Sequence, residues 1–201
     1  AGRASASIRD TDISAAGWIQ ASPEVFTLRP GQSRNVRLTA RFPASSADQQ
    51  NYYATLAAEA VYLDGQRAGA SRALIEVKGD QGEDAPELEM TALRLSGTEN
   101  AGEYALSARV TNIGNVLVRP ELAYFLVDDA GQPLQSADLT SSEDAPLLPL
   151  AARGFGAIVE TGGVEEGAYT LLVVARDGDR ELTEQSLPVR LSEEGGLELL
   201  E

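Results

Sequence analysis

Carboxylates are the only chemically active side chains that this sequence supplies in quantity. Its 201 residues include 31 Asp and Glu but no His and no Cys. This composition excludes histidine acid–base catalysis, thiolate metal sites and disulfides. Carboxylate pairs are so plentiful that none is specific for catalysis. Neither a Gly-x-Ser-x-Gly motif nor a phosphate-binding glycine loop is present. The sequence therefore predicts a non-enzymatic protein without a cofactor.

Two acidic turns are the best calcium candidates in the chain. They contain Asp128 and Asp129 in one case, and Asp177 and Asp179 in the other. Calcium takes oxygen ligands, and these turns would supply them. However, neither turn follows the EF-hand spacing, and hairpin turns favour Asp and Gly for backbone reasons alone. We predict that no metal binds, and we keep these four residues as weak calcium candidates.

Short apolar runs separated by turn residues indicate the strands that must position these carboxylates. The stretch 18–42 is typical of a strand–turn–strand hairpin, with Pro30-Gly31 as its turn. Val36, Leu38 and Ala40 alternate with polar residues, which predicts that they face inward. Further strands are expected over 52–63 and 70–78. A set of seven more is expected over 88–96, 103–112, 120–128, 134–139, 152–160, 167–176 and 180–191.

The composition changes sharply over the acidic stretch around 79–87, which contains Gly and Pro. We predict an all-β protein of two tandem immunoglobulin-like β-sandwiches, over 1–80 and 88–192, with a linker at 81–87. Residues 193–201 are expected to form a frayed acidic tail. Tyr169 fits either a tyrosine corner, whose hydroxyl anchors a loop, or an ordinary core tyrosine.

The first half resembles a known family. Pro23-Glu24-Val25-Phe26-Thr27-Leu28, Pro30 to Leu38, and Tyr52-Tyr53 are similar to the first domain of PapD-type pilus chaperones. The second half, with Val110-Thr111-Asn112-Ile113-Gly114-Asn115, resembles immunoglobulin-like modules of bacterial surface and periplasmic proteins. The resemblance implies that the four strands expected within residues 18–78 are the fourth to seventh of the first domain.

The first strands of that domain have no counterpart in the sequence, so the first sandwich is expected to be incomplete. Three explanations stay open: a piece of a longer protein, strands supplied by a partner chain, or a smaller self-contained fold.

The chaperone family binds a carboxylate through a basic pair, which here implies Lys78 with Arg3 or Arg9. Leu74, Glu76 and Lys78 share one strand face and are the candidate interaction residues. Ala73, Ile75 and Val77 share the other face, which core packing explains equally well.

The charge balance limits the partners of this protein. The net charge of −15 disfavours nucleic acid and anionic membranes. No run approaches the length of a membrane span, and no signal peptide is present. We expect an exported protein, in the periplasm or at the cell surface, whose signal has been removed.

We expect it to act through strand edges, either as an assembly chaperone or as a fibre component. Its partner would then be another protein or a copy of itself. The alternative is a carbohydrate- or cell-wall-binding module, in which Trp18, Tyr52 and Tyr53 could form a platform. Aromatic residues make up only 5% of the chain, which weakens that alternative.

Overall fold

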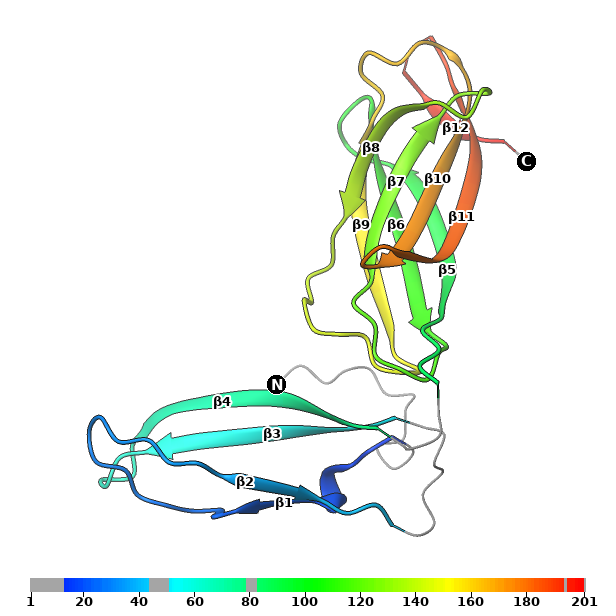
Figure 1. Ribbon diagram of the computed structural model, residues 1–201. Coiled ribbons are helices and arrows are strands. Elements are labelled where there is room, and N and C mark those ends of the chain that lie inside the picture. The colour runs from blue at the N-terminus through cyan, green and yellow to red at the C-terminus, as the bar shows by residue number, and fades with distance from the viewer. Residues whose placement is uncertain (1–12, 44–50, 79–82, 194, 201) are drawn as a thin grey trace. The chain divides into compact units, whose positions relative to one another are not determined.

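A computed structural model describes residues 13–43, 51–78, 83–193 and 195–200 (Figure 1). The chain is all-β: its described residues form twelve strands and a single 3-10 turn, Ala16–Trp18. It divides into two compact units between Glu83 and Asp84, inside the predicted linker. Residues 1–12, whose weak apolar alternation fits either a strand or a loose arm, lie outside the described residues.

The second unit, over residues 84–200, is a sandwich of two antiparallel sheets. One sheet has the order β12-β11-β10-β7-β8, and the other has the order β5-β6-β9. All seven predicted strands form, with ends within one residue of the predicted bounds. Their bounds are β5 (Leu88–Gly97), β6 (Glu103–Asn112), β7 (Glu121–Val127), β8 (Pro133–Leu139), β9 (Ala152–Glu160), β10 (Gly167–Asp177) and β11 (Arg180–Leu191).

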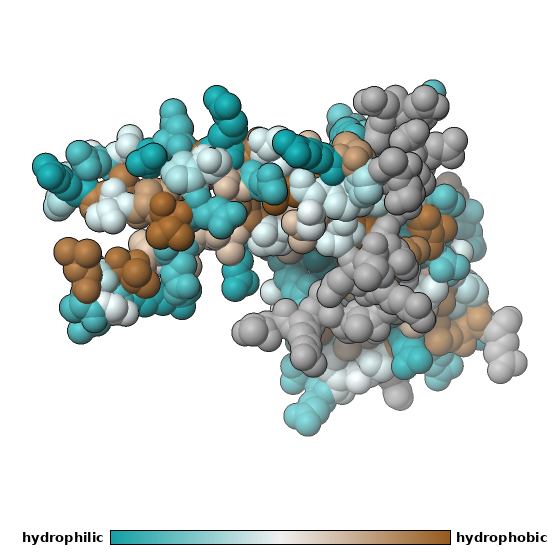
Figure 2. Space-filling model, turned by 90° about the horizontal axis from the view of Figure 1, so that it is seen from below, coloured by the Kyte–Doolittle hydropathy of each residue, from teal (hydrophilic) through white to brown (hydrophobic). Residues whose placement is uncertain are grey.

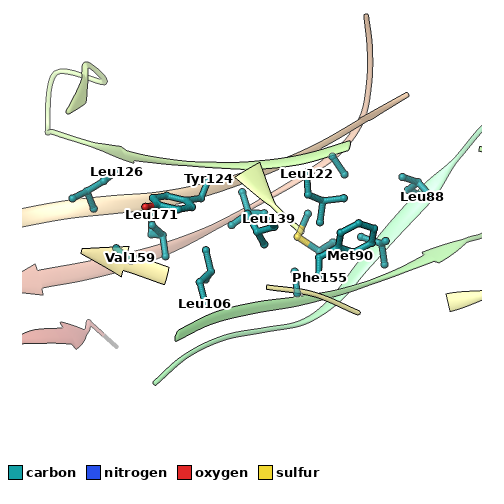
Figure 3. Packing of buried hydrophobic residues seen from close by; sticks show 14 of the residues in the cluster. Leu88, Met90, Leu106, Leu122, Tyr124, Leu126, Leu139, Phe155, Val159 and Leu171 are labelled. Atoms are coloured by element: carbon teal, nitrogen blue, oxygen red, sulfur yellow. The ribbon is translucent and has the colours of Figure 1, made fainter. Parts of the chain in front are cut away.

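A single hydrophobic core fills the space between these sheets (Figure 3). In β6, β7 and the middle of β10, alternate side chains enter it, because successive residues of a strand point to opposite faces. Leu106 comes from the three-stranded sheet, whereas Leu126 and Leu171 come from the five-stranded sheet. All three are at most 1% exposed. Such burial is what makes a β-sandwich of this size stable by itself.

Asn112, from the Val110–Asn115 motif, is a buried structural residue. Its Nδ2 donates hydrogen bonds to the carbonyls of Val116 and Leu147, at 2.8 and 2.9 Å. Its Oδ1 accepts one from the amide of Gly114 at 3.0 Å. A Cβ on Gly114 would lie 2.3 Å from the carbonyl oxygen of Ala85, so this position requires glycine. The motif therefore closes one end of the sandwich and carries no chemistry.

Tyr169 forms a tyrosine corner. Its hydroxyl donates a hydrogen bond to the carbonyl of Glu165, four residues upstream, at 2.9 Å. This geometry confirms the tyrosine-corner interpretation, because the bond anchors the loop that leads into β10.

The prediction of a frayed acidic tail over 193–201 is wrong for residues 197–199. Residues Leu197–Leu199 form β12, which pairs with the end of β11. Gly195 adopts a left-handed backbone with φ of 78°, which allows the chain to reverse. Leu197 then enters the core, where it is 7% exposed, and its amide donates to the Tyr104 hydroxyl at 2.7 Å. Alternating leucines thus outweigh the acidic composition.

The first unit, over residues 13–83, contains two separate two-stranded ladders. One pairs β1 (Ile19–Ser22) with β2 (Arg37–Ala40), and the other pairs β3 (Tyr52–Val61) with β4 (Arg67–Val77). The strands predicted over 52–63 and 70–78 are confirmed. The stretch 43–51, whose polar and small residues predict a loop, lies largely outside the described residues.

The predicted hairpin over 18–42 is only partly right. A turn does form at Pro30-Gly31, where the amide of Gln32 donates to the carbonyl of Arg29 at 3.0 Å. However, β2 pairs with Ile19–Ser22 and not with the predicted strand around 25–28. Pro23 has no amide hydrogen to donate to a ladder, which weakens a strand that starts there. The inward burial predicted for this hairpin is also wrong, because Leu38 is 40% exposed.

Candidate interaction surface

One face of the β3–β4 ladder is uniformly apolar or small. In this ladder Tyr52 pairs with Val77 and Ala54 pairs with Ile75, and the next pair on the same face is Leu56 with Ala73. The opposite face carries most of the polar side chains, together with Leu74 opposite Thr55. There, Tyr53 pairs with Glu76, and the tyrosine hydroxyl donates to the carboxylate at 3.0 Å. This alternation is typical of a strand pair that packs one face against a second sheet.

The β1–β2 ladder has the same two-faced character. Ala21 pairs with Leu38 on its apolar face, whereas Gln20 pairs with Thr39 on its polar face. Both ladders of the first unit therefore present one face that is suited to a protein interior.

Three aromatic rings join the two ladders at one end. The centroids of Trp18 and Tyr52 lie 4.4 Å apart, and those of Trp18 and Phe42 lie 5.4 Å apart. Tyr52 and Tyr53 are 6% and 5% exposed. These distances are typical of packed aromatic pairs, which supports the core interpretation of these rings over a carbohydrate platform.

Away from this end, the apolar side chains of the unit are open to solvent. Among the described residues, ten of the sixteen exposed large hydrophobics belong to this unit, although it is the smaller one. Figure 2 shows hydrophobic residues exposed on the part built from β1–β4, at the left of the view. The open apolar surface is defined here as these ten residues: Val25, Phe26, Leu28, Val36, Leu38, Phe42, Val61, Tyr62, Leu63 and Leu74.

The backbone of β3 adds an open strand edge to this surface. One edge pairs with β4 along its whole length. In the described part of the chain, the second edge pairs only at Tyr53, through an isolated bridge to Ser14. The amides and carbonyls of the rest of that edge can therefore accept another strand.

The charge of the chain is divided unequally between the two units. Residues 8–83 contain eight basic and nine acidic side chains, whereas the remaining residues contain eight basic and 22 acidic ones. Four arginines lie in the single stretch 29–41, and the guanidinium of Arg34 lies 5.8 Å above the ring of Phe26. The open apolar surface is thus bordered by positive charge.

The predicted interaction residues lie on the polar face of β4 or just beyond its end. Leu74 is 41% exposed and belongs to the open apolar surface, whereas Glu76 accepts the bond from Tyr53. Lys78 follows the last residue of β4 and is exposed. Arg3 and Arg9, its expected partners in a basic pair, lie outside the described residues. The sequence predicts an interaction on this face, whereas the row of apolar and small pairs lies on the opposite face of the ladder.

The calcium candidates lie in two separate hairpin turns. The Asp128 carboxylate accepts bonds from the amides of Ala130 and Gln132, at 2.9 and 2.8 Å, and so shapes the β7–β8 turn. The turn with Asp177 and Asp179 lies at the opposite end of β10. Over the described ranges, no three acidic side chains gather in a group that could hold a metal ion.

The comparisons with known proteins add little. No protein-family model and no curated protein matches the chain. A solved structure of Pseudomonas fluorescens alkylpurine DNA glycosylase AlkC, bound to DNA containing an abasic site analog, is similar at 14% identity with a TM-score of 0.36. The match covers 51% of this chain and 30% of that chain, so it spans less than a third of the glycosylase. Likeness at this level carries no functional argument.

Among the described residues, none belongs to a helix long and apolar enough to cross a membrane.

Proposed function

We propose that this chain is a non-enzymatic, exported interaction protein whose first unit takes up an extended strand of a partner polypeptide. The open apolar surface is the observation that carries this proposal. Soluble monomers rarely leave so many large apolar side chains uncovered, and such patches mark interaction sites. A strand added at the open edge of β3 would gain backbone hydrogen bonds and cover the apolar faces together.

In this proposal both units are immunoglobulin-like sandwiches, and the first is completed by the partner. The resemblance of residues 23–38 and 52–53 to pilus chaperones supports this view, as does the presence of one apolar face on each of the β1–β2 and β3–β4 ladders. Two roles follow from it: an assembly chaperone in the periplasm, or a structural component of a surface fibre.

The first test is the assembly state of the 201-residue chain, measured by light scattering and electron microscopy of the same sample. A fibre component should form ordered oligomers, whereas a chaperone should stay monomeric and bind a peptide of alternating Val and Thr one-to-one. Leu38→Glu puts a charge on the apolar face and should abolish either association. Thr39→Glu is the matched control, because it puts the same charge on the opposite face of the same strand.

The proposal fails if the chain is a monomer that binds neither the peptide nor a hydrophobic dye. It also fails if Leu38→Glu and Thr39→Glu weaken association equally, because the apolar face would then have no special role.

A further inference from the structure

A shallow depression of about 390 Å³ lies on the outer face of the β5-β6-β9 sheet, on the side away from the core. Two arginines line it together with hydroxyl side chains and two glycines, and its lining contains no acidic side chain. Its lining includes Arg94, Arg109, Ser107, Thr140, Gly154 and Gly156.

A β-bulge in β5 brings the second arginine to this face. Thr91 pairs with Arg109, and Arg94 pairs with Ser107. Between these two pairs β5 has two residues, whereas β6 has only one. Without the extra residue, Arg94 would stand opposite Leu106 and point into the core. The bulge contains Ala92, whose φ of 54° lies in the left-handed region that residues with a Cβ disfavour. Bulges and strained residues of this kind are over-represented beside functional sites.

Two glycines leave the floor of the depression without side chains. Gly154 pairs with Arg109 and Gly156 pairs with Ser107. A Cβ built on Gly154 would meet no atom within 4 Å, so a side chain there would extend into the depression. Gly156 also exchanges two backbone hydrogen bonds with Thr140, at 2.8 and 2.9 Å. These bonds hold the 140–142 segment, whose three residues line the depression, beside β9.

The two arginines differ in their charged neighbours: Arg109 has Arg94 on one diagonal and Glu89, which is opposite Thr111, on the other. In the described part of the chain, neither Arg94 nor Arg109 belongs to an ion pair. They occupy diagonal positions on neighbouring strands, about 7–8 Å apart at the backbone, within reach of two long side chains. Like charges so placed repel each other, and an anion between them would remove that cost. This cationic depression stands out in a unit whose acidic residues far outnumber its basic ones.

We propose that this depression binds a saccharide that carries one oxyanion, namely a carboxylate, phosphate or sulfate. Guanidinium groups bind these planar or tetrahedral anions through paired hydrogen bonds. The volume suits one or two sugar rings, and the hydroxyls of Ser107, Thr140 and the two following serines suit a polyhydroxylated ligand. The site lies in the second unit and does not depend on the function proposed for the first.

The test is ligand-observed NMR with the full chain and matched pairs of probes. Galacturonate, glucose 6-phosphate and glucose 6-sulfate should bind, whereas galactose and glucose should not. Arg109→Gln and Arg94→Gln should each weaken binding by about tenfold or more. Arg190→Gln is the control, because it removes an exposed arginine from the other sheet.

Gly154→Val tests the shape of the site without touching either arginine. It should abolish binding while the chain keeps its melting temperature, because the added side chain fills open space on a strand that favours β-branched residues. The site is absent if no charged sugar binds, or if Arg190→Gln weakens binding as much as Arg109→Gln. Equal binding of acetate or inorganic phosphate would overturn the saccharide assignment.

Discussion

Tyr124 is the side chain of the second unit whose ionisation we expect to affect stability. Burial, and secondarily the charge of Glu160, raise the pKa of its hydroxyl above the usual value of about 10. The hydroxyl donates to the carbonyl of Ile158 at 3.2 Å and accepts from Nε2 of Gln135 at 3.0 Å. Folding therefore favours the protonated, neutral phenol.

From this shift we predict a loss of stability at alkaline pH. Because the pKa is higher in the folded state, the contribution of Tyr124 is complete below about pH 10 and disappears as the pH rises through the folded pKa. Tyr124→Phe should cost about 1–2 kcal/mol at neutral pH and should flatten the alkaline loss. Denaturant unfolding across pH measures both effects. Tyr62→Phe, at a 62% exposed position, should leave the profile unchanged; equal profiles for all three proteins would contradict the prediction.

At the level of single residues, the sequence also contains a signal for the β-bulge in β5. In β5 the apolar residues fall on even positions at Leu88 and Met90, then on odd positions at Leu93 and Leu95. This switch of parity is the sequence signal of a bulge, which we did not use. The diagonal placement of Arg94 and Arg109 on one face could not be predicted, because it depends on the exact register of β5 against β6.

At the scale of elements, β12 shows how a short strand can complete a sheet. Its single buried side chain, Leu197, covers the end of the core, whereas Leu199 of the same strand is 52% exposed. The segment therefore stabilises the sandwich through one residue.

We predict that Leu197→Ala destabilises the second unit by about 2–3 kcal/mol, because it removes a buried leucine. Leu199→Ala should change the free energy of unfolding by less than about 0.5 kcal/mol, because it is a surface position. Chemical denaturation of both variants measures the difference. If the two substitutions cost the same, β12 does not close the core.

Strands of the second unit were predictable because their local alternation and turns agree with the final fold. The β1–β2 pair was not, because its partners are separated by a long loop and no local signal selects them. Among the sites, the open apolar surface could be expected in outline from the missing strands. Its exact membership required the structure, because seven of its ten residues lie outside the strands and only Leu38 lies on an apolar ladder face.

For the whole molecule, the two units should respond differently to salt and to hydrogen exchange. The second unit has a continuous core and most of the negative charge, whereas the first has a small core at one end. Amides of β1–β4 should therefore exchange faster than those of β6, β7 and β10. Raising the ionic strength from about 0.01 M to 0.5 M should slow exchange in the second unit more, because salt screens its self-repulsion.

Hydrogen-exchange mass spectrometry of the full chain resolves both units in one experiment. Uniform protection along the chain would show that the first unit is as stable as the second. An equal response of the two units to salt would show that the uneven charge does not affect stability.

The open apolar surface also bears on how much of this protein a cell can keep. Chaperones and proteases recognise uncovered apolar side chains, so a copy without its partner would resemble an unfolded chain to them. Partner binding would stabilise the first unit by mass action and hide that signal. Copies in excess of the partner would then be degraded, and the partner's abundance would set the amount of this protein that survives.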